Sequence, residues 1–343
     1  MSILKTFGRL PEGEYIERTH RSNQFHDGAF QNIHNTPMMA KDSSFTKLLR
    51  DFFSLPPDRT PAKEIKSVQR ELKKNPSGKN SITWFGHSSY ALQAGDKFIL
   101  VDPVFCGYAS PFPFMVKSFK GTNTYHANDF KEIDLLILTH DHYDHLDYKT
   151  IQSLRPNVKK VICSLGLASH LVFWGYDPGK IIELDWWESA EPFDDIHIQA
   201  APARHFSGRG LKRGQSLWSS FILQIKDKKI YLGGDSGYDT HFKEIGERFG
   251  PFDLAILECG QYNEKWPLIH MMPEETVKAG LDLRAKMVLP VHWGKFALAF
   301  HSWTEPVNRF TAEAKRLKLS YTTPMIGEEI ILDEMYPDKE WWM

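Results

Sequence analysis

The 343-residue sequence is poor in cysteine, in long apolar runs and in net charge. Its three cysteines, Cys106, Cys163 and Cys259, are odd in number and far apart. They form neither a disulfide framework nor a CxxC motif, which favours a reducing compartment. No apolar run reaches the roughly 18 residues that a transmembrane helix needs. Residues Met1–Pro11 lack the apolar core of a signal peptide, so we expect a cytoplasmic protein.

The balance of charge excludes one class of partner. The chain has 42 Lys and Arg against 43 Asp and Glu, a net charge of −1, so no overall field attracts it to nucleic acid. Its 41% hydrophobic and 25% charged residues are typical of a globular protein with a sizeable core. Aromatic residues reach 13%, which fits an apolar cavity or an apolar surface.

A short apolar run, Leu135–Leu138, reads as a buried strand and leads through Thr139 into the sequence HDHYDH. Imidazole and carboxylate groups are ligands of zinc and similar divalent ions. In an extended turn, residues two apart point the same way. His140 and His142 are therefore expected to share one metal, while Asp144 and His145 reach a second.

The rest of the chain divides near residue 80. Residues 1–80 are predicted to be an irregular N-terminal extension with short helices packed on the core, at about 43–55 and at 63–74. The first helix has one apolar face, which either docks on the body or touches lipid. From Ser81, apolar runs and turn residues predict alternating strands and helices. The strands are expected at 82–85, 89–93, 97–101, 135–138, 161–162, 181–184, 196–200, 219–225, 229–232, 254–257 and 287–290, and the helices at 148–154, 165–174 and 273–283.

Three more of these predicted strands lead to residues of the ligand type: His205, Asp235 and His292. Loops at one end of successive strands commonly build sites in α/β folds. The seven candidates suit two metals, with His140, His142 and His205 on one, Asp144, His145 and His292 on the other, and Asp235 bridging. The set lacks thiolate, so zinc is the default, with iron or manganese as alternatives.

Two further residues near these strand ends each fit two roles. Asp102, at the end of the 97–101 strand, is either a hydrogen-bond partner of a ligand histidine or a turn residue. His87 is expected to be a hydrogen-bonding loop residue rather than part of the site edge. The loop 109–121, rich in Pro and Phe, either forms a rim of the site or grips an apolar substrate or membrane.

Taken together, these motifs resemble the metallo-β-lactamase fold. Within that superfamily the chain resembles the N-acylphosphatidylethanolamine-hydrolysing phospholipases D. The similarity runs from about Thr83 to Pro306 and includes segments that do no metal chemistry. The segments that carry it are TW (83–84), GH (86–87), DP (102–103), ASP (109–111), HYDHLDY (142–148), ELDWWE (183–188), GDSGY (234–238), EIGERFGPFDLA (244–255), PEE (273–275) and HWGKFALA (292–299).

The resemblance implies a four-layered αβ/βα sandwich over residues 81–343, two divalent ions per chain and the same seven ligands. It implies cleavage of a phospholipid phosphodiester by a hydroxide held between the metals, which releases an N-acylethanolamine and phosphatidic acid. Asp144, Asp235 and His270 would be catalytic. The alternative is a lactonase or another hydrolase of the same fold acting on a small ester or lactone.

The resemblance also bears on the substrate and the partners. His270, Tyr262, Phe114 and Met115 are expected to contact substrate, although Met272 stands where the family has an aspartate. The family implies a homodimer and peripheral contact with a membrane, here its inner surface. Trp341 and Trp342, near the C-terminus, would be exposed if they made no contact within their own chain, and they could then dock on a second chain.

Overall fold

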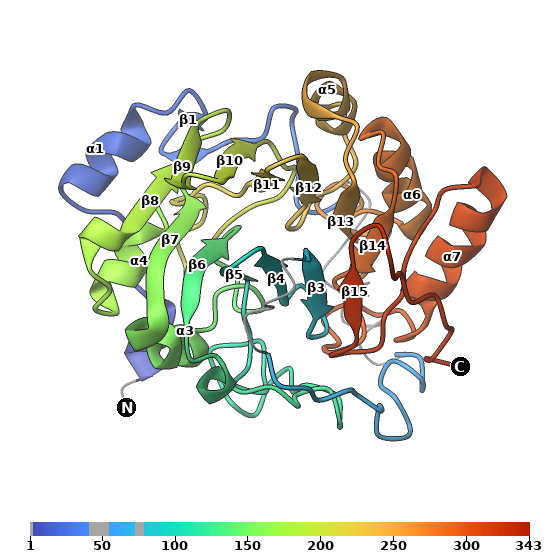
Figure 1. Ribbon diagram of the computed structural model, residues 1–343. Coiled ribbons are helices and arrows are strands. Elements are labelled where there is room, and N and C mark those ends of the chain that lie inside the picture. Colours follow the sequence, from blue (N-terminus) through green and yellow to red (C-terminus); the bar gives the residue numbers. More distant parts are fainter. Residues whose placement is uncertain (1–2, 41–54, 73–78) are drawn as a thin grey trace.

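Two β-sheets lie face to face in the computed structural model, which describes residues 3–40, 55–72 and 79–343 (Figure 1). The first sheet has seven strands in the order β15-β3-β4-β5-β6-β7-β8. Strands β5 to β8 pair in parallel, and the pairs β15–β3, β3–β4 and β4–β5 are antiparallel. Their bounds are β3 Ser81–Trp84, β4 Tyr90–Ala94, β5 Lys97–Val101, β6 Ile133–Leu138, β7 Val158–Ser164, β8 Ile181–Leu184 and β15 Glu329–Ile331.

The second sheet has six strands in the order β14-β13-β12-β11-β10-β9. Strands β12, β13 and β14 are parallel, and the other pairs are antiparallel. Their bounds are β9 Ser189–Phe193, β10 Ile196–Ala201, β11 Ser220–Ile225, β12 Lys228–Leu232, β13 Leu254–Glu258 and β14 Val288–Val291. A small hairpin, β1 Phe25–His26 and β2 Ala29–Phe30, stands apart from both sheets.

Helices cover the outer face of each sheet. Strand β6 is buried along its whole length because its alternate residues face two different cores. Leu135 and Ile137 belong to the core between the sheets, and Leu136 and Leu138 to the core beneath α3 and α4. The described α-helices are α1 Glu14–His20, α3 Tyr148–Leu154, α4 Ala168–Phe173, α5 His241–Phe249, α6 Pro273–Asp282 and α7 Glu305–Leu317.

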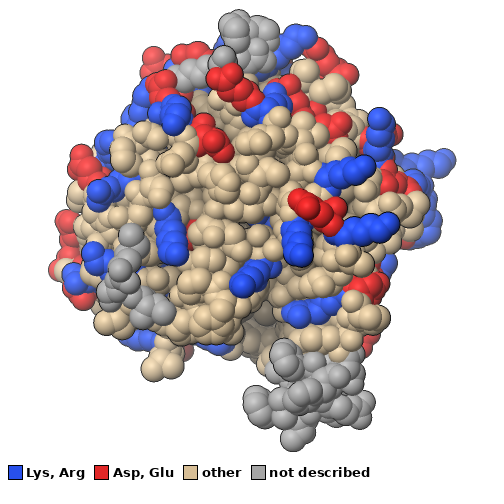
Figure 2. Space-filling model, turned by 90° about the horizontal axis from the view of Figure 1, so that it is seen from below, with Lys and Arg blue, Asp and Glu red and all other residues tan. Residues whose placement is uncertain are grey.

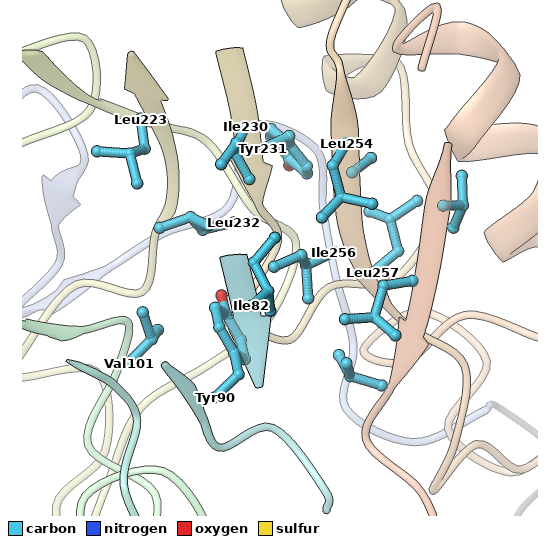
Figure 3. Packing of buried hydrophobic residues seen from close by; sticks show 14 of the residues in the cluster. Ile82, Tyr90, Val101, Leu223, Ile230, Tyr231, Leu232, Leu254, Ile256 and Leu257 are labelled. Carbon is cyan, nitrogen blue, oxygen red and sulfur yellow. The ribbon is translucent and has the colours of Figure 1, made fainter. Parts of the chain in front are cut away.

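The core between the sheets joins them into one body. Figure 3 shows Ile82, Tyr90 and Val101 of the first sheet approaching Leu232 and Ile256 of the second. Apolar residues of α5, α6 and α7 extend the same cluster on the far side of the second sheet. The expected four-layered αβ/βα sandwich is therefore confirmed.

The N-terminal extension differs from its prediction. The helix expected near 43–55 lies outside the described residues, apart from its last position. The prediction of a helix at 63–74 is wrong over the part that the structure describes, because residues 63–72 contain no helix. The backbone N–H groups of Ile65 and Val68 instead donate to Lys120 O and Ile326 O, at 3.0 and 2.7 Å. This segment is an extended strap that bonds to other parts of the chain.

The C-terminal aromatics are also placed differently from the sequence expectation. Trp342 is buried and donates its indole N–H to Asn308 Oδ1 at 2.7 Å. Trp341 stacks on Trp293, with ring centroids 5.3 Å apart. The tail therefore docks on its own chain and is not left free for a partner.

Acidic and basic residues are mixed on the lower face of the molecule, in the orientation of Figure 1. Figure 2 shows acidic and basic side chains around the rim of this face, with single basic side chains among the uncharged residues of its middle. Of the helices that the structure describes, none has the length and apolar character needed to cross a bilayer.

Candidate metal centre

The predicted ligands follow four strands that end at the same edge of the sandwich. His140, His142, Asp144 and His145 follow β6 of the first sheet. The other three ligands follow strands of the second sheet: His205 after β10, Asp235 after β12 and His292 after β14. All seven are buried except His142, which is partly exposed. The fold thus brings together residues that are up to 152 positions apart, as the strand-end pattern predicts.

One group of ligands consists of His140, His142, His205 and Asp235, whose nitrogen and oxygen atoms lie within 4.8 Å of one another. His142 Nδ1 is 3.1 Å from both His140 Nε2 and His205 Nε2. A second group, also within 4.8 Å, consists of His87, Asp144, His145 and His292. These are the two predicted sets, with His87 added.

Asp235 stands between the two groups. Its Oδ2 is 3.7 Å from His140 Nε2 and 3.8 Å from His205 Nε2. Its Oδ1 is 3.1 Å from both His145 Nε2 and His292 Nδ1. One carboxylate oxygen therefore faces each group, which is the arrangement that a bridging ligand needs.

The chemistry of these donors fits divalent cations. Burial lowers the pKa of His140, His205 and His292 well below the ordinary value, so their rings are neutral, as metal ligands must be. His145 Nε2, His292 Nε2 and Asp235 Oδ1 are buried and make no hydrogen bond. Buried polar atoms are almost always satisfied, so three such atoms among these residues fit a site for a cation.

His145 lies in negative surroundings, which also suit a cation. Burial alone would lower the pKa of its imidazole, but the Asp235 and Asp144 carboxylates raise it well above the ordinary value. Its Nδ1 lies 2.8 Å from Asp102 Oδ2, and Asp102 also accepts hydrogen bonds from Thr139. Asp102 is therefore the hydrogen-bond partner of a candidate ligand histidine, which agrees with one of its two predicted roles.

His87 belongs to the site, contrary to the expectation of a loop residue. It is fully buried, and its Nε2 is 2.9 Å from Asp144 Oδ2. His87, Asp102 and His292 all adopt left-handed backbone conformations, with φ of 53°, 40° and 68°. Such conformations cost about 1–3 kcal/mol each and cluster at functional sites. The sequence signal was a polar residue at a strand end, the same signal that identified the other ligands.

A second residue that the sequence analysis missed is Glu258, at the end of β13. Its Oε2 is 2.8 Å from Nδ1 of His270, and its Oε1 accepts hydrogen bonds from the backbone of Ser236 and Met271. Burial raises the pKa of Glu258 to about 7. Burial lowers the pKa of His270, but the Glu258 carboxylate outweighs it and raises that pKa to about 9. His270 is thus held as a proton donor beside the ligands.

A cavity of about 520 Å³ opens over these groups. Five of the seven predicted ligands and His270 line it, together with apolar side chains and one arginine. The other lining residues are Met38, Met39, Ala109, Tyr143, Phe206, Arg213, Gln261, Trp266, Ile269 and Leu298.

The expected substrate contacts agree with the cavity only in part. His270 lines it, but Phe114, Met115 and Tyr262 do not. Phe114 and Met115 are 73% and 46% exposed on their loop, which reaches the cavity at Ala109. Tyr262 is buried, and its hydroxyl donates to Glu305 Oε1 at 2.7 Å, so it is directed elsewhere. Its neighbour Gln261 takes the place in the wall.

Comparisons with known proteins agree with this geometry. A family model described as a beta-lactamase superfamily domain matches residues 97–293. An uncharacterised protein of Mycobacterium tuberculosis is 35% identical over 94% of this chain and 88% of its own length. The N-acyl-phosphatidylethanolamine-hydrolyzing phospholipase D 1 of Caenorhabditis elegans is 34% identical over 63% of this chain and 64% of its own. The solved structure of a metallo hydrolase from Ignicoccus hospitalis has a TM-score of 0.57 at 19% identity, over 75% of this chain and all of that one.

The family match spans more than half of the chain, and the fold and the ligand geometry agree with it. The chain therefore belongs to the metallo-β-lactamase superfamily, as one of its metal-dependent hydrolases.

Proposed function

We propose that this protein is a phosphodiesterase of the phospholipase D type that holds two divalent ions, with zinc as the default and iron or manganese as alternatives. The observation that carries the proposal is Asp235, whose two oxygens face two separate groups of ligands. The substrate is an N-acylphosphatidylethanolamine, the lipid that the nematode relative is named for hydrolysing.

His140, His142 and His205 would hold one ion, and Asp144, His145 and His292 the other, with Asp235 shared. His87 would hold the Asp144 carboxylate in place. Ions bound there would lower the pKa of water and would neutralise charge on phosphoryl oxygens.

The residues of the chain then account for the proton that the reaction needs. Water adds to phosphorus, and the bond between phosphorus and the ethanolamine oxygen breaks. The products are phosphatidic acid and an N-acylethanolamine, whose oxygen must gain a proton. His270 lines the cavity and is held protonated by Glu258, so it is placed to give that proton.

The proposal includes contact with a membrane surface, because the substrate is a membrane lipid. Phe114 and Met115 are exposed beside Lys117, and they would lie against lipid rather than inside the cavity. A homodimer, and a site of action at the inner membrane surface, belong to the same proposal.

The test is an assay of the purified protein, as isolated and after chelation, against N-acylphosphatidylethanolamine and bis(p-nitrophenyl) phosphate, with metal content measured in parallel. We expect metal-dependent release of phosphatidic acid, and its loss in Asp235→Asn, which keeps the shape of the side chain but not its charge. Full activity in the metal-free protein would contradict the proposal. Cleavage of a lactone, with neither phosphodiester cleaved, would identify the alternative hydrolase.

A further inference from the structure

The N-terminal extension reaches the metal centre through the side chain of Asn32. Its amide Nδ2 donates to the carbonyl oxygen of His205 at 2.8 Å, and its Oδ1 accepts from the backbone N–H of His205 at 3.0 Å. Both backbone groups of a candidate ligand are therefore held by one side chain, 173 positions away in the sequence. No other predicted ligand has its backbone N–H and C=O held by a single side chain in the described residues.

Asn32 is itself fixed in place. The indole N–H of Trp218 donates to Asn32 Oδ1 at 3.0 Å. Phe30, two residues earlier, is buried in a cluster with Trp186 and Trp218, and its N–H donates to Gly214 O at 2.8 Å. The side-chain amide of Asn32 thus makes two hydrogen bonds with His205 and a third with the buried indole of Trp218.

The residues after Asn32 continue along the site. The guanidinium of Arg204, the neighbour of His205, donates to Thr36 Oγ1 at 2.9 Å and to Asn35 O at 3.2 Å. Met38 and Met39 then form part of the wall of the cavity. The segment 30–39 therefore holds the backbone of His205 and the side chain of Arg204, and lines the cavity as well.

The imidazole of His205 is held at its other end. Its Nδ1 lies 2.8 Å from Ile269 O, which makes Nδ1 the protonated nitrogen and leaves the lone pair of Nε2 for a metal. Ile269 fixes the ring, and Asn32 fixes the backbone from which the ring projects. Partners of this kind are worth 10–100-fold in metal affinity.

We propose that Asn32 is a positioning residue of the metal centre, and that the segment 30–39 contributes to metal binding at this site. The inference rests on the two-ion centre proposed above. It applies to one ion only, the one held with His140 and His142, because His205 does not belong to the group of His145 and His292.

The test compares the full-length wild type with Asn32→Ala and with Gln31→Ala. Gln31 is a matched control, since it is the next residue and its exposed side chain contacts only His26 O, at 3.4 Å, among the bonds of the described residues. Metal-free protein is titrated with Zn²⁺ against a chromophoric chelator, and with Co²⁺ followed by its visible absorption. We expect Asn32→Ala to lose 10–100-fold in affinity for one ion, with a changed Co²⁺ spectrum, and Gln31→Ala to match the wild type.

A merely structural role predicts a different result. If Asn32→Ala only loosened the fold, both ions would be weakened together and the metal-free protein would melt earlier. Equal weakening of both ions, or unchanged binding of both, would overturn the inference, as would an equal loss in Gln31→Ala. Should Asn32→Ala fail to fold, Trp218→Phe keeps an aromatic ring at that position and removes the indole N–H, which is shared between Asn32 Oδ1 and Ala203 O at 3.0 and 3.1 Å, and a smaller loss at the same ion is expected.

The result is separable from the proposed function. A wild type that binds two ions and cleaves no phosphodiester contradicts the proposed function and leaves the role of Asn32 standing. A phosphodiesterase whose Asn32→Ala variant binds both ions normally does the reverse.

Discussion

Three imidazoles of the candidate metal centre have the same arrangement of neighbours. Nδ1 of His140, His145 and His205 lies within 3.0 Å of a protein oxygen, and Nε2 of each faces Asp235. The oxygens belong to Thr139, Asp102 and Ile269. Each ring therefore has a fixed tautomer, with its free lone pair turned toward the carboxylate that the two groups share.

The gathering of the seven candidate ligands could be predicted at this scale because strand ends carry them in a recognisable spacing. Glu258 and His87 could not, because each is a single polar residue after an apolar strand, a pattern that also fits an ordinary turn. Their roles depend on neighbours far along the chain: Glu258 on His270 and His87 on Asp144. Only the folded structure supplies those distances.

The role proposed for His270 as a proton donor predicts a dependence on the leaving group. We expect His270→Gln to lower kcat for an alkyl phosphodiester by about 10²–10⁴-fold, because general acid catalysis contributes that much. Cleavage of bis(p-nitrophenyl) phosphate should fall far less, since p-nitrophenolate leaves without a proton. Steady-state kinetics on both substrates provide the measurement.

Glu258→Gln serves as the companion variant for this prediction. It keeps an oxygen near His270 Nδ1 but removes the charge that holds the proton, so its loss should follow the same pattern at smaller size. An equal loss on both substrates in the two variants would instead place His270 in substrate binding or metal positioning.

His241, which is not one of the candidate ligands, provides a pH-dependent test of stability. It is buried at the start of α5, and burial lowers its pKa to about 3. Between that value and an unfolded pKa of about 6.5, the unfolded chain binds a proton that the folded chain does not, so stability falls as the pH falls. At pH 5 this costs about 2 kcal/mol, and above pH 7 it costs almost nothing.

Urea unfolding of the metal-free protein at pH 7.5 and pH 5 measures the effect. His241→Gln retains a group that can bond to Ser236 Oγ, which lies 3.2 Å from His241 Nε2. We expect the variant to lose about 2 kcal/mol less than the wild type between the two pH values. An identical loss in both proteins would show that His241 accepts a proton without unfolding.

At the scale of elements, the sequence predicted those whose apolar pattern is strong. Strands β5 and β8 and helix α3 have the predicted bounds, and strands β10 to β14 lie within two residues of theirs. Strand β9 was missed because it is a partly exposed edge strand that contains Pro192. The amphipathic helices α5 and α7 were also missed, and the strap at 63–72 was mistaken for a helix, since its partners at Lys120 and Ile326 are remote in sequence.

The C-terminal tail is an element whose value can be measured. Trp342 is 5% exposed and meets Trp293 edge to face at 5.5 Å, directly beside the ligand His292. Removing a large buried aromatic side chain costs about 3–5 kcal/mol, so Trp342→Ala should lower the free energy of unfolding by that amount. Deletion of Met343, which is 87% exposed, is the control and should change it little. A stable Trp342→Ala variant would mean that the tail is not docked in solution.

At the scale of the whole molecule, the candidate ligands follow strands of both sheets. The segment after β6 of the first sheet supplies four of the seven, and strands of the second sheet supply the other three, so ions at this edge would join the two sheets. An ion that binds only the folded chain adds about 2.7 kcal/mol of stability at 100 times its dissociation constant. We expect chelation to lower the free energy of urea unfolding in one cooperative transition, because the core between the sheets makes them a single body. Added Zn²⁺ should restore that loss in the wild type and only in part in Asp235→Asn, which lacks the charge that faces both groups. If Zn²⁺ stabilised Asp235→Asn as much as the wild type, the ions would have to bind elsewhere, and the shared position of Asp235 would not be what couples the two sheets.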